Sequence, residues 1–377
     1  MSKRHTNGRS KPAVMARHVI ALASLCVGLG LVALLTCPRW FPSLGPRNKM
    51  PGISTTGSAA HVPVSLAELL QQVVQRPGNV DIALMNLVCA QGLPGYGGGD
   101  ARQWLATLDA WSEQVRRETD RALPEFRRHP EAYHHSEAYF RALCLVTVLQ
   151  QDLGVRYNPA RITPPDAPEP DEVFFADSQD LFLHGMLGPR RSGTCISLPV
   201  LHVAVGRRLG YPLKLVLAKG HVFARWESSD GTDRFNLEVT NQGLNCFPDE
   251  YYEEWPYPMT AEEVRSGRYL KSLTPAEELA LFLQTRGHCL RSAGRFTEAR
   301  EAYFQSQGLA PHWPENEFLI ARVTPAPAIT APLSRPPLNT LATEAEAMNR
   351  YHRQSLPPGG GSGPSAWPAL PSLRTKP

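Results

Sequence analysis

The stretch RRSGTCISLPVLHVAVGRRLG at residues 190–210 decides the fold. After Thr194 its apolar residues recur at helical spacing as far as Gly210, which predicts a helix with Ser192 or Thr194 as its N-cap. Cys195 then lies at or near the first turn, where unpaired backbone amides and the helix dipole favour the thiolate. Because the thiolate is the nucleophilic form of cysteine, this position predicts a reactive residue. The same amides could stabilise an oxyanion.

Three strands are expected after this helix. Their segments are 213–218, 221–227 and 234–240, and the last two are separated by Asp230-Gly231, a hairpin-turn signal. A turn centred on that dipeptide joins the second and third strands as an antiparallel pair.

The turn also sets the register of this pair. Residue 223 would face residue 238, so that His221 and Glu238 become diagonal neighbours on one face of the sheet. Diagonal neighbours lie roughly 7–8 Å apart between backbones, and their side chains come closer. A carboxylate–imidazole hydrogen bond is therefore expected, with Asn236 and Asn241 as alternative partners of the imidazole.

The order of these residues resembles the transglutaminase-like branch of the papain-like superfamily. GTCISLPVLHVAVGRRLGYPLKLV resembles its Cys helix and first strand, HVFARWE its His strand, and FNLEVTNQG the strand that usually ends in Asp-x-Thr followed by Gly. The resemblance implies an α+β fold in which the Cys helix packs on an antiparallel sheet. It implies a nucleophile at Cys195, a general base and acid at His221, and an orienting acid at Glu238. Many members have Asp at this last position, and the longer Glu side chain is less constrained.

A second resemblance concerns residues 280–313, which are similar to one tetratricopeptide repeat. The residues that match its intervals are Leu283, Gly287, Leu290, Ala299, Tyr303 and Pro311. The chain thus resembles most closely the bacterial transglutaminase-like proteins whose core is followed by tetratricopeptide-type helices. About three repeats are usual for independent stability, so we expect this unit to dock on the core and not to form a peptide-binding superhelix.

A membrane anchor is predicted near the N-terminus. The segment VIALASLCVGLGLVALLTC at 19–37 is 19 residues long and carries no charge. At about 1.5 Å rise per residue it can just cross a hydrocarbon core of about 30 Å. The basic excess in the tail 1–18 predicts a single-pass protein with a cytoplasmic N-terminus and an extracytoplasmic main domain. A cleaved signal peptide, giving a secreted protein, is the first alternative, and a lipid anchor at LLTC is the second.

Composition divides the rest of the chain. We expect a linker at 38–60, a helical N-terminal region at 61–155, the transglutaminase-like core at 156–272, tetratricopeptide-like helices at 273–322 and a Pro/Gly-rich tail at 323–377. The core opens on a proline-rich, acidic stretch at 156–172 that predicts a surface loop. The tail cannot bury enough apolar area to offset its ordering entropy, so it is predicted to be disordered.

Other polar and aromatic residues near the Cys helix receive mainly structural interpretations. Gln179 could donate to an oxyanion as a papain-type glutamine does, but a capping or exposed amide is the simpler interpretation. Asp177 and Asp180 resemble acidic positions of the family, without an assigned role. His184 is expected to pack or cap, since no second metal ligand lies at helical spacing. The aromatic run FPDEYYEEWPYP at 247–258 could rim the site, but we expect it to pack against the following helices.

Composition also excludes several classes of protein. Much of the net charge of +4 lies in the first 17 residues, and no basic stripe with interleaved aromatics follows, so nucleic acid is not an expected partner. None of the seven cysteines forms a CxxC pair, which argues against zinc-ribbon and thioredoxin-like sites. No metal and no organic cofactor is expected.

We therefore expect a membrane-anchored, thiol-dependent hydrolase or acyl transferase that acts on an amide of a peptide or protein. The alternative is a catalytically inactive binding module that keeps the fold and uses its groove and helices for a partner. Protease, deamidase and cross-linking reactions share this triad, and the sequence does not separate them.

Overall fold

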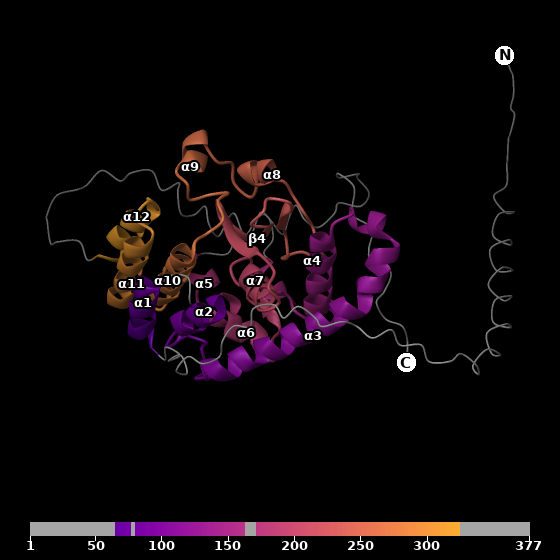
Figure 1. The fold of residues 1–377 in the computed structure, drawn as a ribbon. Helices are drawn as coiled ribbons and strands as arrows, with labels where there is room; N and C mark the ends of the chain where they lie inside the picture. Colours follow the sequence, from indigo (N-terminus) through magenta and orange to yellow (C-terminus); the bar gives the residue numbers. More distant parts are fainter. Residues whose placement is uncertain (1–64, 77–79, 163–170, 325–377) are drawn as a thin grey trace, which may run out of the picture. The chain divides into compact units, whose positions relative to one another are not determined.

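The computed structural model describes residues 65–76, 80–162 and 171–324 (Figure 1). These residues fall within one compact unit of the chain. Within these ranges no helix combines the length and the apolar character that crossing a bilayer requires. The predicted anchor at 19–37, the linker at 38–60 and the tail from residue 325 onward lie outside the described residues.

The N-terminal part of the described chain is helical. Its first three helices begin after Ser65, Asp81 and Asp100, whose side chains accept hydrogen bonds from first-turn amides. The elements are α1 (Leu66–Gln75), α2 (Ile82–Ala90), α3 (Ala101–Arg128), the 3₁₀ turn η1 (Pro130–Tyr133), α4 (Glu137–Thr147) and the π-helical turn η2 (Val148–Asp152).

A three-stranded antiparallel sheet supplies the β part of the α+β fold. Its strands, in spatial order, are β3 (Leu213–Ala218), β4 (His221–Glu227) and β5 (Arg234–Leu237). Ala224 pairs with Leu237, which is the register predicted from the Asp-Gly turn. β5 is shorter than the predicted strand at 234–240, because Glu238 leaves the ladder and bridges Asn245 instead.

The helix α7 (Leu198–Arg208) packs across β3 and β4, as expected for the Cys helix. It begins three residues after Cys195, which lies in the turn leading into it. Gly210 ends the helical segment with a φ of +79°, a conformation that glycine adopts without strain.

Several short elements connect α4 to α7. They are β1 (Arg156–Tyr157), η3 (Pro159–Arg161), α5 (Asp171–Phe174), η4 (Ser178–Asp180), α6 (Leu183–Leu187) and β2 (Ser192–Gly193). β1 and β2 pair in parallel, and Tyr157 and Asn158 are buried. The predicted surface loop at 156–172 was therefore wrong for its first residues, which belong to the interior beside the Cys turn.

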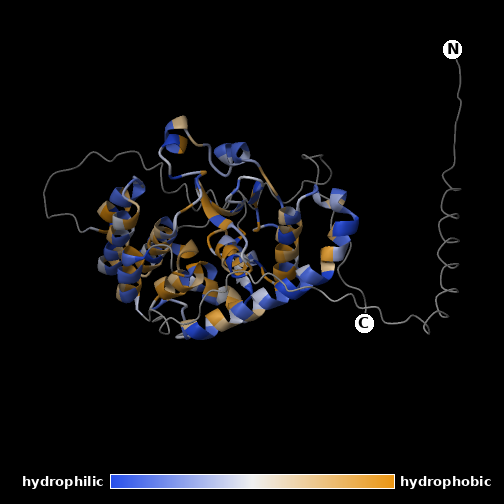
Figure 2. Ribbon diagram, in the orientation of Figure 1, coloured by the Kyte–Doolittle hydropathy of each residue, from blue (hydrophilic) through white to orange (hydrophobic). Residues whose placement is uncertain are grey.

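Helix α2 lies at the centre of the helical part. All of its residues are buried, since α1, α3, α6, α7 and the C-terminal helix α10 (Pro275–Ser292) pack around it. The central helices are accordingly orange in Figure 2, and α3, along the lower edge, is mostly blue. A helix that is apolar on every face needs such a surround.

The aromatic run at 247–258 covers the sheet. It contains α8 (Asp249–Glu254) and is followed by α9 (Ala261–Arg265), both above β4 in Figure 1. Tyr252 and Trp255 form a second apolar cluster with Val216 and Phe223 of the sheet. The expectation that this run packs against the following helices was wrong, because its rings pack on β3 and β4.

Three helices end the described chain: α10, α11 (Phe296–Leu309) and α12 (Glu315–Val323). α10 and α11 pack closely at Gly287, where a methyl group would come within 2.3 Å of the Tyr303 ring. α10 also packs against α1, α2 and α5. The helical unit thus docks on the rest of the domain, and N-terminal helices supply much of the surface that receives it.

Candidate active site

Cys195 lies in a tight turn between β2 and α7. The Thr194 carbonyl accepts hydrogen bonds from Ser197 N at 3.2 Å and Leu198 N at 2.9 Å, and Thr194 Oγ1 accepts one from Ile196 N at 3.4 Å. Thr194 therefore caps this turn, but the N-cap of α7 is Ser197, so the prediction of Ser192 or Thr194 as the cap of the helix was wrong. These bonds engage the amides of Ile196 and Ser197, so those two are not open donors for an oxyanion.

Asp180 supports the Cys turn from the preceding segment. Its backbone carbonyl accepts a hydrogen bond from Ser197 Oγ at 2.7 Å. Its fully buried carboxylate accepts from Asn158 Nδ2 at 2.7 Å, Arg161 Nε at 2.7 Å and Arg190 Nη2 at 2.9 Å. A buried carboxylate with two guanidinium partners is fixed in place. Asp180, which had no role from the sequence, thus positions the turn that carries Cys195.

His221 and Glu238 form the predicted pair. His221 opens β4, Glu238 follows β5, and His221 Nε2 donates to Glu238 Oε2 at 2.8 Å. Both side chains are buried. The bond follows from the register, because diagonal neighbours on one face of an antiparallel pair point their side chains to the same side.

The Glu238 carboxylate is saturated with hydrogen bonds. Oε2 also accepts from Tyr252 Oη at 3.2 Å, and Oε1 accepts from Thr240 N at 3.0 Å and Thr240 Oγ1 at 2.7 Å. Burial raises the pKa of Glu238, but the charge of His221 and the bonds from His221 and Thr240 outweigh it, so the pKa lies below its ordinary value. This carboxylate is ionised, and it can orient an imidazole but has little capacity left for other donors.

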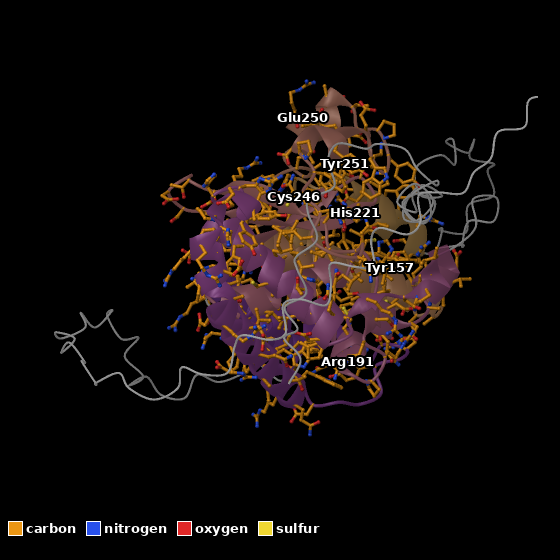
Figure 3. All side chains as sticks on the ribbon, turned by 90° about the vertical axis from the view of Figure 1, so that its right-hand side faces the viewer. Tyr157, Arg191, His221, Cys246, Glu250 and Tyr251 are labelled. Atoms are coloured by element: carbon orange, nitrogen blue, oxygen red, sulfur yellow. The ribbon has the colours of Figure 1, made fainter. Side chains whose placement is uncertain are left out.

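Aromatic rings of the 247–258 run cover the His–Glu pair. The Trp255 ring lies 5.0 Å from the His221 ring in an edge-to-face arrangement, and Tyr252 stacks on Phe223 at 3.9 Å. Figure 3 shows His221 within the outline of the protein, with Tyr251 of α8 above it. Tyr252 and Trp255 therefore exclude water from the His–Glu pair. The aromatic run is visible in the sequence, but its pattern does not indicate which of its rings reach the site.

Cys195 and His221 line one cavity of about 60 Å³. This is room for a few water molecules or the end of a slender side chain. Its walls come from the Cys turn, the β3–β4 hairpin and α10, together with Phe175 and Arg268. The remaining lining residues from those three elements are Ile196, Leu217, Ala218, Gly220, Val222, Leu281, Gln284, Thr285 and His288. The candidate nucleophile and the candidate base thus line the same pocket.

The alternative residues lie elsewhere. Gln179 is not among the residues that line the cavity, and its backbone amide donates to Asp177. Asn236 is held by Arg225 Nε at 2.7 Å, so it belongs to a structural network and not to the imidazole. His184 is buried, which lowers its pKa to about 4, and it lies 3.3 Å from Ser178 Oγ. It therefore packs as a neutral ring.

Burial sets the acidity of the other four thiols that the structure describes. Burial raises the pKa of Cys89, Cys144 and Cys246 to about 12, and it raises that of Cys289 further. No disulfide joins any of the cysteines that the structure describes. The same portion of the chain contains no cluster of three or more His, Cys, Asp or Glu side chains that could hold a metal ion.

Comparison with known proteins gives one match. Residues 102–284 match the family model described as "Transglutaminase-like superfamily". The match begins within α3 and ends at Gln284 in α10, so it extends on both sides of the predicted core at 156–272. No curated protein and no solved structure matches the chain significantly. The chain therefore contains a transglutaminase-like domain.

Proposed function

We propose that this chain is a thiol-dependent enzyme that cleaves or transfers the acyl group of an amide through a thioester at Cys195. The observation that carries the proposal is the 2.8 Å bond from His221 Nε2 to Glu238, beside a cavity that His221 shares with Cys195. The match of residues 102–284 to the transglutaminase-like superfamily supports a cysteine-based reaction.

Each residue has a role in the proposed reaction. Glu238 holds Nε2, so Nδ1 is the ring nitrogen that exchanges a proton with Cys195. The Cys195 thiolate attacks the carbonyl carbon, a C–S bond forms, and the C–N bond breaks as His221 protonates the leaving amine. Water then attacks the thioester in hydrolysis, or a second amine attacks it in transfer. Either attack releases the acyl group and returns the proton to Cys195 through His221.

The test is the reactivity of the cysteines in the folded protein. Cys195 should react with iodoacetamide faster than Cys89, Cys144, Cys246 and Cys289, because burial raises the pKa of those four thiols whereas Cys195 shares a cavity with the imidazole of His221. His221→Ala should slow Cys195 by at least about tenfold and leave the other rates unchanged. Peptide mapping by mass spectrometry gives each rate. Equal rates at all five positions, or no effect of His221→Ala, would support the inactive binding module instead.

The proposal places this domain outside the cytoplasm, anchored by the segment at 19–37. That part rests on the charge and hydropathy of the sequence.

A further inference from the structure

The lining of the cavity beside Cys195 includes a permanent positive charge. None of its lining residues, all of which lie in the described ranges, is Asp or Glu. Arg268, from the loop before α10, is the lining residue with a permanent charge. Burial lowers the pKa of His288 to about 3, so this ring is neutral. Arg268 is therefore the permanent positive charge among the lining residues, and Glu315, which is not one of them, lies against its Nη1.

Arg268 is held in place and still has donors available. It is buried, and its guanidinium lies 4.8 Å from the ring of Trp313 and 5.2 Å from that of Tyr269. Its Nη1 lies against Glu315 Oε1, and its Nε has no hydrogen-bond partner among the described residues. A guanidinium has five N–H donors, so one carboxylate leaves several unused. Such a fixed guanidinium can bind a second carboxylate without a large ordering cost.

Gln284 adds an acceptor to the same wall. Its Nε2 donates to Asn316 Oδ1 at 2.8 Å and to Glu315 Oε1 at 3.1 Å. Both partners are acceptors here, because Asn316 uses its own Nδ2 as a donor to Ala310 O. The orientation of the Gln284 amide is thereby fixed, and its Oε1 is left to accept an N–H from a bound molecule.

We propose that Arg268 and Gln284 form a subsite for a substrate carboxylate, with Arg268 binding the carboxylate and Gln284 Oε1 accepting an N–H. This inference rests on the proposed function, since it names the class of amide that Cys195 attacks: one that lies beside a free carboxylate. A peptide C-terminus and an acidic side chain both carry this group. The cavity of about 60 Å³ has room for such an end group.

Two alkylating reagents test the subsite directly. Iodoacetate and iodoacetamide both transfer a two-carbon unit to a thiolate with loss of iodide, but only the first carries a carboxylate. The measured quantity is the rate constant for iodoacetate divided by that for iodoacetamide at Cys195, normalised to the same ratio for glutathione. This normalised ratio should be at least about tenfold lower in full-length Arg268→Gln than in the unchanged protein.

Matched variants fix the direction of the effect. Arg268→Lys keeps the charge and should retain most of the preference. Glu315→Gln removes the competing carboxylate and should raise the ratio. Lys219→Gln, which removes a cation paired with Glu263 at 2.8 Å, should leave it unchanged. Rapid alkylation of Cys195 with the same ratio in all variants would overturn the subsite alone, whereas a Cys195 that reacts no faster than the buried thiols would overturn the proposed function.

Protection experiments identify the source of the carboxylate. Acetyl-Ala-Ala, acetyl-Ala-Ala-amide and acetyl-Ala-Glu-amide are each added before iodoacetamide. Protection of Cys195 by the first peptide alone assigns the subsite to a C-terminus, and protection by the third alone assigns it to an acidic side chain. Equal protection by all three, or by none, would overturn the assignment to a peptide carboxylate. Whichever of these two peptides protects Cys195 in the unchanged protein, it should no longer protect Cys195 in Arg268→Gln.

Discussion

A buried ion pair ties the Cys helix to the wall of the cavity, and its removal has a calculable cost. Arg207 of α7 donates to both oxygens of Glu278 in α10, at 2.9 Å and 2.6 Å. Glu278 is completely buried, and Arg207 also donates through Nε to the Leu213 carbonyl at 2.9 Å. Arg207→Ala deletes the main partner of a buried carboxylate.

Breaking a buried pair by removing one partner costs about 3–5 kcal/mol, because an uncompensated charge stays in the interior. In a domain of 150–250 residues, 1 kcal/mol corresponds to a shift in Tm of roughly 2–4 °C. We therefore expect Arg207→Ala to lower Tm by roughly 6–20 °C. Replacement of the carboxylate as well, in Arg207→Ala/Glu278→Gln, should recover a large part of this loss, since no charge is then buried.

The pH dependence gives a second measurement. Burial raises the pKa of Glu278, and Arg207 opposes that rise. In Arg207→Ala the pKa should rise further above that of the unfolded chain, so the folded state binds an extra proton. Stability then falls as pH increases above the unfolded pKa of about 4.3. The deficit in Tm should therefore be larger at about pH 8 than at about pH 5.

Thermal unfolding followed by circular dichroism measures both effects. A Tm of Arg207→Ala within about 2 °C of that of the unchanged protein at neutral pH would refute a stranded buried charge, since that shift corresponds to no more than about 1 kcal/mol. A double variant that is no more stable than the single one would refute it as well, because the loss would then not come from a stranded charge.

Two further predictions concern the site and the topology. Glu238→Gln should slow the alkylation of Cys195 by about 10–100-fold near neutral pH, because an amide stabilises the imidazolium less than a carboxylate does; unchanged rates would remove Glu238 from the proposed triad. A reporter enzyme that is active only in the cytoplasm, fused after residue 60, should be inactive; activity of this fusion would contradict the predicted orientation.

The His–Glu pair was predictable because local signals determine it. Asp230-Gly231 is a turn of known geometry, and Gly231 has the expected positive φ of +74°. The alternation of side chains along the strands then gives the rest. The register that pairs Ala224 with Leu237 follows from the turn, and with it the contact between His221 and Glu238.

The surroundings of this pair could not be predicted in the same way. Tyr252 donates to Glu238 from 14 residues away, within an aromatic run that has neither helical nor strand periodicity. From the sequence alone, the Glu238 side chain was therefore expected to be less constrained than an Asp side chain. The hydrogen bonds from His221, Thr240 and Tyr252 show how the longer side chain is fixed. Similarly, the pairing of β1 with β2 joins two-residue segments that carry no strand signal.

Helix α10 contributes to the candidate site. The composition of the sequence changes near residue 273, yet Gln284 and His288 of α10 line the same space as Cys195 and His221. The family match also continues past residue 273 and ends at Gln284. Since Arg207 ties the Cys helix to α10, a shift of α10 would alter the cavity and the support of α7 together. The extent of the candidate site is therefore set by the residues that line the cavity, and these come from both sides of residue 273.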